Sequence, residues 1–455
     1  MAKNLVYDIH DRPQTGKLIV FAIQQLLAIM AATIAVPAQV GYGMSASAAL
    51  FGAGMGTLVY QLFTRFRSPV FLGSSFAFIP SLCAAFAGAV TVSLGYLGLI
   101  MGAVMAGLVY VAIALVVKYA GVAWIAKLMP AAVIGPTVAL IGLSLSSAAV
   151  NGAFLYTSPV GGYFEMNGTL WLALIIAITT MLVVMLCSTF GKKMTKLIPF
   201  VIGVLAGYAI ALIFTVIGYI GGIDAMKIID FAPFKALVDG GVSVSTFLTL
   251  PDFTFARAFR GFKDLDASYV AKIAFAYVPV AFVVFAEHIA DHKNLSSIIG
   301  EDLLENPGLH RTVLGDGVGS IVGAFFGGCP NTTYGESVGC VAITRNASVI
   351  TITLTSLLAI GISFLSPFVA FLSSIPSCVM GGVCITLYGF IAVSGLKMIQ
   401  KVDLEDYANL FTVSVILIPG IGGLALSVGG IKITAIACSL ILGMIVNLIL
   451  HRKKS

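Results

Sequence analysis

The chain has 455 residues, of which 59% are hydrophobic and only 10% charged, and its mean hydropathy is +1.06. A composition this apolar excludes an ordinary water-soluble globular domain. The formal net charge of +6 requires no nucleic-acid partner, although a basic patch could bind anionic lipid headgroups. The seven cysteines stand singly in apolar surroundings, without metal-ligand spacing, so we expect small hydrophobic residues and no metal or other cofactor.

Apolar segments follow one another along the chain, and a helix needs roughly 20 such residues to cross a bilayer. In the first half we expect spans near residues 18–39, 48–63, 69–90, 94–117, 130–150, 169–188 and 197–221. After a mixed stretch, residues 222–268, a second set is expected near 269–290, 312–328, 334–344, 348–372, 377–396, 406–428 and 431–450. The sequence therefore predicts an all-α membrane protein of fourteen transmembrane segments. The tenth is too short to span and must be a half-helix buried in protein.

Positive charge orients these segments, because cytoplasmic loops of membrane proteins are rich in Lys and Arg. With the amino terminus inside, most of the 25 Lys and Arg residues fall on the cytoplasmic side. They include Lys3, Lys193, Arg452, Lys453 and Lys454. We therefore expect a multi-pass protein of the cell (inner) membrane, with both termini cytoplasmic and residues 222–268 as an extracytoplasmic connecting segment.

Three motifs recur in the same order in the two halves of the chain. The pairs are GAGMGTLV (52–59) with GDGVGSIV (315–322), SSFA (74–77) with TTYG (332–335), and PAAVIG (130–135) with PSCVMG (376–381). Because each half has an odd number of spans, the halves enter the membrane from opposite faces, which predicts two inverted seven-span repeats, residues 1–221 and 269–455. The glycine spacing lacks the strand and acidic residue of a dinucleotide site, so we interpret it as close helix packing.

Ionisable side chains inside a bilayer are costly, so each one is a functional candidate. The candidates are Glu287, His288, Asp291, His292, Asp316 and Glu336. Glu287 and Asp291 share one helix face and the two histidines share a neighbouring face. A zinc site at this HxxxH pair would need a third ligand, and none is evident. The simpler alternative is that this run is the polar cytoplasmic end of its span, and we interpret Asp316 as a packing or capping residue.

An extended stretch, residues 330–336, leads into the half-helix, and residues 73–76 form its counterpart in the first half. Two short extended segments are therefore expected to face each other near the midplane of the membrane. Such a site offers backbone N–H donors, hydroxyl groups and carboxylate acceptors.

Six motifs, several of them long, resemble the nucleobase/ascorbate transporter family, most closely its uracil-carrying branch. They are QQLLAIMAATIAVP (24–37), FLGSSFAF (71–78), AEH (286–288), DLLENPGLHR (302–311), PNTTYGESVGCVAITR (330–345) and VMGGVCITLYGFIAVSG (379–395). The resemblance implies a core domain of spans 1–4 and 8–11, a gate domain of spans 5–7 and 12–14, and short antiparallel strands in spans 3 and 10. It also implies a homodimer.

The implied activity is import of uracil in symport with protons, by alternating access. The residues implied to bind or line the site are Glu287, Glu336, Gly335, Phe76, Ser75, Tyr334, Tyr388 and Ala32. The chemistry agrees with uracil, whose imide N–H groups suit carboxylates and whose carbonyl groups suit the backbone N–H groups of Gly335 and Phe76.

Two positions depart from the family pattern. Asp291 stands where the family has a coupling histidine, and His292 lies about 100° further around the helix. The family's Gln-His pair in span one reads Gln24-Gln25. We therefore expect proton coupling at Asp291 and Glu287, with His292 as a further candidate and sodium as the alternative ion. The remaining alternatives are a xanthine or urate permease of the same family, and an anion transporter or channel of the same architecture. An enzyme is not expected.

Overall fold

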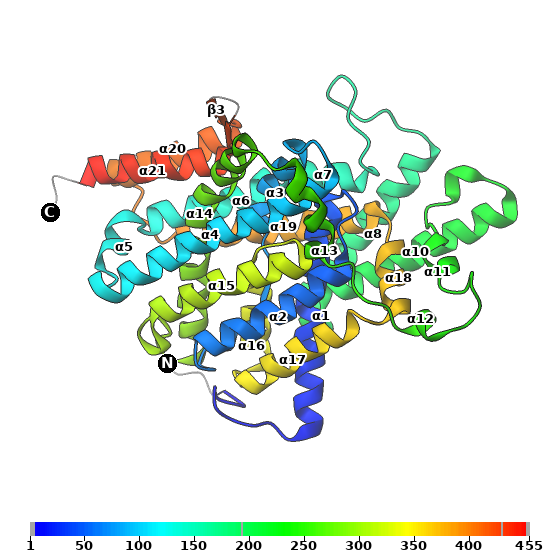
Figure 1. Ribbon diagram of the computed structural model, residues 1–455, viewed down its shortest axis with the longest axis horizontal. Coiled ribbons are helices and arrows are strands. Elements are labelled where there is room, and N and C mark those ends of the chain that lie inside the picture. Colours follow the sequence, from blue (N-terminus) through cyan, green and yellow to red (C-terminus); the bar gives the residue numbers. More distant parts are fainter. Residues whose placement is uncertain (1–4, 193, 429–430, 452–455) are drawn as a thin grey trace.

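The computed structural model describes residues 5–192, 194–428 and 431–451. The expectations for Lys3, Lys193, Arg452, Lys453 and Lys454 therefore lie outside the described residues. Within the described chain, eight helices are long and apolar enough to cross a membrane. These helices pack side by side into one bundle (Figure 1), and the many exposed apolar side chains on their outer faces are those expected of a surface in contact with lipid. The protein is thus an integral membrane protein, as predicted.

The first half of the chain is helical apart from one short strand. Its elements are α1 (Thr15–Val40), α2 (Ala46–Phe63), β1 (Leu72–Ser74), η1 (Phe76–Phe78), α3 (Ile79–Ala87), α4 (Val92–Ala120), α5 (Ala123–Leu128), α6 (Ala131–Ser144), α7 (Ser146–Ala153), α8 (Gly168–Phe190), α9 (Met194–Leu197) and α10 (Pro199–Gly221). The connecting segment that follows has only short helices: η2 (Asp224–Met226), α11 (Ala232–Ala236), α12 (Val244–Phe247), α13 (Thr254–Ala258) and η3 (Phe259–Asp264).

The second half repeats the pattern of long helices interrupted by a strand and half-helix, and it has two further strands near its end. Its elements are α14 (Ala267–Ile299), η4 (Leu304–Gly308), α15 (Leu309–Gly327), β2 (Asn331–Thr333), α16 (Gly335–Thr344), α17 (Val349–Ile362), α18 (Ser366–Ser374), α19 (Ser377–Ile399), α20 (Tyr407–Ile421), β3 (Leu426–Val428), β4 (Ile431–Ile433) and α21 (Ala435–His451).

Several predicted segments differ from the observed helices at their ends or are divided. The segment predicted at 348–372 is two helices, α17 and α18, separated by a turn. The last two predicted segments, 406–428 and 431–450, are shorter, because the apolar residues between them form the antiparallel hairpin β3–β4. Averaged hydropathy missed this hairpin, although apolar and polar residues alternate on both sides of a Gly-Gly pair, a sequence pattern typical of a hairpin. Helix α14 is longer than predicted and continues to Ile299.

The repeated glycine motifs pack helix α2 directly against helix α15. A Cβ atom on Gly52 would lie 2.5 Å from the carbonyl oxygen of Gly323, and one on Gly56 would lie 2.7 Å from that of Gly319. Only glycine permits so close an approach of two helix backbones. The interpretation of these glycines as a packing motif is therefore confirmed.

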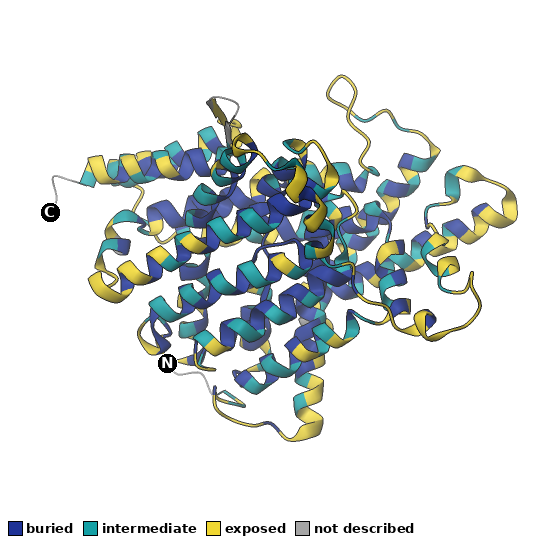
Figure 2. Cartoon of the chain, in the orientation of Figure 1, coloured by how far each residue is buried: buried dark blue, intermediate teal, exposed yellow. Residues whose placement is uncertain are grey.

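Strands β1 and β2 pair in antiparallel fashion at the centre of the bundle, as the family resemblance implied. The paired residues are Leu72 with Thr333, Gly73 with Thr332, and Ser74 with Asn331. The side-chain amide of Asn331 donates to the carbonyl oxygen of Gly52 at 3.1 Å, so β2 is fixed to α2. Buried residues concentrate in this central region, whereas α8 and α10 show many exposed side chains (Figure 2). The paired strands are thus held in the best-buried part of the protein.

Candidate functional site

A small cavity lies where the two strand-to-helix turns meet helices α14 and α19. Its volume of about 70 Å³ is several times the ~10–15 Å³ that one water molecule needs. Its lining combines acidic, aromatic and apolar side chains with an exposed glycine. The lining residues are Phe76, Val138, Glu287, Ala290, Asp291, Thr332, Tyr334, Gly335, Glu336, Phe390, Ile391, Ser394 and Met398.

Each strand ends at the amino terminus of a short helix, and both termini are directed at this region. Helix α16 begins at Gly335 immediately after β2, and η1 begins at Phe76 after β1. No side-chain hydrogen bond caps either helix. The first N–H groups of a helix have no partner within the helix and carry partial positive charge. Exposed Gly335 therefore presents hydrogen-bond donors to the cavity.

Helix α14 supplies the acidic wall of the cavity. Glu287 and Asp291 are one turn apart and both line it. The hydroxyl of Thr333 donates to Oδ2 of Asp291 at 2.8 Å. The other oxygen, Oδ1, lies 3.9 Å from the position that a Cβ atom on Gly335 would take. With Glu336 in the first turn of α16, three carboxyl groups thus surround one helix amino terminus.

Aromatic side chains form the opposite part of the wall. The hydroxyl of Tyr334 donates to the carbonyl oxygen of Ser74 at 2.8 Å, which ties the two turns together. The ring of Phe76 is nearly parallel to that of Tyr334, with centroids 6.5 Å apart. Tyr388 packs edge-on against Phe76 at 5.4 Å. These rings offer flat apolar surfaces on which a planar ligand can stack.

The structure thus brings together most of the predicted binding residues. Glu287, Glu336, Gly335, Phe76 and Tyr334 all line the cavity, as does Asp291. The remaining three, Ser75, Tyr388 and Ala32, are buried but do not line it. Tyr388 contacts it through Phe76, and the backbone N–H of Ser75 donates to the carbonyl oxygen of Pro330 at 2.9 Å.

The two histidines lie on another face of α14, away from the cavity. His288 Nδ1 is 2.7 Å from Oδ2 of Asp316, and both side chains are fully buried. His292 Nε2 is 2.7 Å from the hydroxyl of Tyr60. The two histidines are therefore enclosed by protein. The run from Glu287 to His292 lies inside α14, which continues to Ile299, so the structure does not favour the alternative that this run is merely the polar end of a span.

Other sequence candidates have structural roles. The amide of Gln25 donates to the hydroxyl of Ser337, which also accepts the N–H of Phe71 at 2.9 Å. This contact ties α1 to α16 and to the loop before β1. Among the described residues, no group of three or more His, Cys, Asp or Glu side chains is arranged to hold a metal ion.

The sequence did not single out the wall formed by α6 and α19. Val138, Phe390, Ile391, Ser394 and Met398 are ordinary apolar or small residues of membrane helices, and composition gives them no signal. The available signal was indirect: Phe390, Ile391 and Ser394 fall within the family motif at residues 379–395, and both helices begin with the paired proline motifs at residues 130–135 and 376–381. Thr333 was noted only as a member of the extended stretch, although its hydroxyl binds Asp291.

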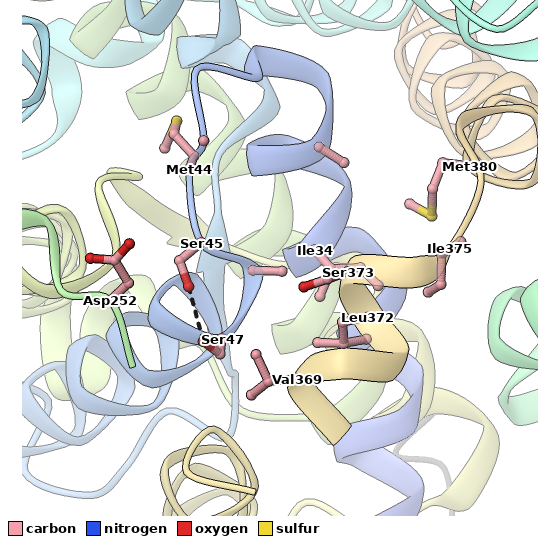
Figure 3. Close-up of a pocket in the computed structure, with 13 residues that line it drawn as sticks. Ile34, Met44, Ser45, Ser47, Asp252, Val369, Leu372, Ser373, Ile375 and Met380 are labelled. Carbon is pink, nitrogen blue, oxygen red and sulfur yellow. Dashed lines mark hydrogen bonds between the residues drawn. The ribbon is translucent and has the colours of Figure 1, made fainter. Parts of the chain in front are cut away.

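A second, larger cavity of about 450 Å³ lies at the amino-terminal end of α19, whereas the central cavity lies nearer its carboxyl-terminal end (Figure 3). It is bounded by the end of α1, the turn into α2, the loop at Asp252, and the junction of α18 with α19. Ser45 and Ser47 lie on one side, joined by a 2.9 Å hydrogen bond, and Leu372, Ser373 and Met380 lie on the other.

A small acidic cavity enclosed in a bundle of apolar helices, with a helix amino terminus directed at it, is the arrangement typical of a membrane transporter. A family model for xanthine/uracil permeases, described as "Permease family", matches residues 16–429. The chain therefore belongs to this permease family. Permeases are transporters rather than enzymes, as the sequence predicted.

Curated relatives align along nearly the whole chain. The uracil permease of Bacillus caldolyticus is 38% identical over 448 residues, which cover 98% of this chain and 94% of that protein. The uracil permease of Bacillus subtilis is 38% identical over 463 residues, covering 99% and 97% respectively. That of Escherichia coli K12 is 34% identical over 443 residues, covering 97% and 93%.

Solved structures of more distant transporters share the fold. The transmembrane domain of a cyanobacterial bicarbonate transporter, BicA, superposes with a TM-score of 0.61 at 16% identity, covering 98% of this chain and all of that one. The murine anion transporter Slc26a9 superposes with a TM-score of 0.62 at 12% identity, covering 98% and 69%. At such low identity the likeness concerns the fold alone.

Proposed function

We propose that this protein imports uracil in symport with protons, by alternating access of the central cavity to the two sides of the membrane. The observation that carries the proposal is the meeting of Glu287 and Glu336 with the exposed amino terminus of α16 in a single small cavity. Curated relatives named uracil permeases, similar over nearly their full length, support uracil as the cargo.

The lining complements a neutral planar ring with donors and acceptors at its edge. The carboxylates of Glu287 and Glu336 would accept the imide N–H groups of uracil, and backbone N–H groups at Gly335 and Phe76 would donate to its carbonyl oxygens. Hydrogen bonds to charged groups are about twice as strong as neutral ones. Phe76, with Tyr334 and Tyr388 behind it, would cover one face of the ring.

The coupling proton is proposed to bind at Asp291 and Glu287. Both side chains line the cavity on α14, and neither lies in a described ion pair with Lys, Arg or His. A cluster of carboxylates in a dry cavity is costly unless protons or cations neutralise it. His292 is a weaker candidate because Tyr60 and the backbone of His288 engage its two ring nitrogens. A sodium ion at the same carboxylates is the alternative.

The proposed architecture has fourteen spans in two inverted repeats, and the packing of the motif pairs supports it. The elements that carry each motif pair lie against each other: α2 against α15, β1 against β2, and α6 against α19. The strand register agrees as well. The repeat aligns Ser74 with Thr332, and hence Gly73 with Asn331. Replacing each residue by its counterpart turns the pair Gly73–Thr332 into the pair Asn331–Ser74. Both pairs are present in the sheet. A twofold axis in the membrane plane would produce this exchange.

The proposed movement is of a core domain (spans 1–4 and 8–11) against a gate domain (spans 5–7 and 12–14). The central cavity has one wall from each, since Glu287 and Glu336 belong to the core and Phe390 and Ser394 to the gate. A relative shift of the two walls would then open or close it. A homodimer in the inner membrane, with both termini cytoplasmic, completes the proposal.

The test is uptake of labelled uracil into proteoliposomes with and without an imposed proton gradient. The proposal expects accumulation that depends on an inward proton gradient and is blocked by unlabelled uracil more strongly than by xanthine. Equal uptake without any gradient would point to a passive pore. Preference for xanthine would point to a purine permease, and gradient-dependent uptake of bicarbonate instead of uracil to an anion transporter.

A further inference from the structure

The outer cavity of about 450 Å³ lies at the end of the bundle that carries residues 222–268, which is the extracytoplasmic end in the proposed topology. Both domains of that proposal contribute to its lining. The ends of α1 and α2 and helix α18, which lies in span 11, belong to the core, and Met380 at the start of α19 belongs to the gate (Figure 3). The lining is mildly polar, with the hydroxyls of Ser45, Ser47 and Ser373. Its one acidic residue, Asp252, is paired with Arg257.

One face of helix α19 leads from the outer cavity to the central one. Met380, Cys384 and Tyr388 are successively four residues apart, so they lie on the same face of the helix. Met380 lines the outer cavity. Tyr388 packs against Phe76, which lines the central cavity. Cys384 therefore lies between the two.

Two contacts between α19 and the core close the passage at this level. The side-chain amide of Gln39, on α1, donates to the sulfur of Cys384 at 3.4 Å. The ring of Tyr388 meets that of Phe76 edge-on, with centroids 5.4 Å apart. Both are weak interactions, because a thiol is a poor acceptor and an edge-on aromatic pair contributes little beyond its buried area. Contacts that must break in every transport cycle are expected to be of this kind.

We propose that the outer cavity is the extracytoplasmic entrance of the transport path, and that Gln39–Cys384 and Phe76–Tyr388 are its closed gate. This inference rests on the proposed function and assigns the route by which a neutral pyrimidine ring reaches the central cavity. The ring crosses the hydroxyl-lined entrance without meeting an unpaired carboxylate until it reaches Glu287 and Glu336.

The first experiment joins the two sides of the gate covalently. A Gln39→Cys variant places a thiol opposite the native Cys384. The two are linked by a bis-methanethiosulfonate with a two-carbon spacer, because a cysteine side chain is shorter than a glutamine and a direct disulfide needs closely spaced Cα atoms. We expect linked protein to lose uracil uptake and a reducing agent to restore it. Linked protein should still bind uracil, since Ser394 and Met398 line the central cavity near the other end of α19.

The matched control is the double variant Gln39→Cys/Cys384→Ser, which carries only one of the two thiols and should keep its uptake after the same treatment. Uptake that is unimpaired in linked protein overturns the proposal. So does failure of the link to form, measured as an unchanged mass.

A second measurement does not depend on the cross-link. Exposed Ser373 lines the outer cavity, so a Ser373→Cys variant should react with a membrane-impermeant thiol reagent added outside right-side-out vesicles, and the attached group should slow uptake. Ser243→Cys, in the exposed connecting segment, should react equally without any effect on uptake. Equal, undiminished uptake in both labelled variants contradicts the entrance. The mass of the cross-linked protein and the thiol reactivity of the variants are measured without uracil. Absence of uracil uptake by the wild-type protein would therefore refute the proposed function separately.

Discussion

The hydroxyl of Thr333 donates a 2.8 Å hydrogen bond to Oδ2 of Asp291, which joins strand β2 to helix α14 at the edge of the central cavity. This bond fixes the orientation of a carboxyl group whose other oxygen faces the amino terminus of α16. The position of Asp291 therefore depends on a strand that is itself held by α2 and α15.

Removal of that hydroxyl is expected to impair transport without unfolding the protein. A hydrogen bond to a charged group is worth about 1.5–3 kcal/mol, so Thr333→Val should lower uptake by roughly tenfold or more. Thr333→Ser keeps the hydroxyl and should retain most of the activity. Initial rates of uracil uptake, normalised to the amount of folded transporter, measure the effect. Equal rates for the Val and Ser variants would show that the bond is unimportant.

Gly73 is required because the ring of Tyr334 lies over it. A Cβ atom at residue 73 would come within 2.2 Å of that ring, and overpacking of this kind costs about 1–3 kcal/mol. We therefore expect Gly73→Ala to lower the thermal midpoint in detergent and to weaken uracil binding. The control is Gly339→Ala in α16, where no atom lies within 4 Å of the added Cβ. The Gly339→Ala variant should keep or raise the thermal midpoint, since alanine is more favourable than glycine inside a helix by about 1 kcal/mol. An unchanged midpoint for Gly73→Ala would contradict the packing argument.

The buried pair of His288 and Asp316 is expected to hold α14 against α15 rather than to bind the cargo. Asp316→Ala leaves a buried imidazole without its partner, and breaking a buried pair in this way costs about 3–5 kcal/mol. Asp316→Asn preserves an acceptor oxygen and should be much milder. Thermal unfolding in detergent distinguishes the two variants. If the alanine variant unfolds like the wild type yet fails to bind uracil, Asp316 belongs to the binding site instead.

The choice of coupling residue can be tested by comparing neighbouring positions on α14. Asp291→Asn removes a group that can bind a proton in the cavity, so it should abolish accumulation driven by a pH gradient while leaving exchange of labelled for unlabelled uracil. His292→Gln changes a residue outside the cavity and should keep the ratio of uptake with and without the gradient, whatever its effect on expression. The opposite pattern would assign the proton to His292.

The central features of the fold were predictable because they depend on patterns that membrane physics enforces. Apolar length indicated the long helices, and the repeated glycines indicated close helix packing, although not which helices would meet. The extended residues before Glu336 indicated the paired strands, because buried non-helical backbone must find partners in protein. The carboxyl groups of Glu287 and Glu336 stood out because ionisable residues are rare in such segments.

Other features could not be predicted from hydropathy, because it does not report which way a side chain faces or which segments of the backbone pair. Averaged hydropathy merges the hairpin β3–β4 with the helices around it, and only the alternation of its residues around a Gly-Gly pair marks it in the sequence. Glu287 and His288 are adjacent in sequence, and only the packing around α14 decides that one faces the cavity and the other faces Asp316. The contribution of Ser394 and Met398 likewise depends on how α19 sits against the paired strands.

The central claim is that carboxyl groups from α14 and α16 together hold a neutral ring in the middle of the membrane. Equilibrium binding of labelled uracil to purified protein tests it most directly, for the wild type, Glu287→Gln, Glu336→Gln and the exposed control Glu305→Gln. We predict that the first two variants weaken binding by roughly tenfold or more, since each loses a charged acceptor, and that Glu305→Gln binds like the wild type. Wild-type affinity in both Glu287→Gln and Glu336→Gln would contradict the claim.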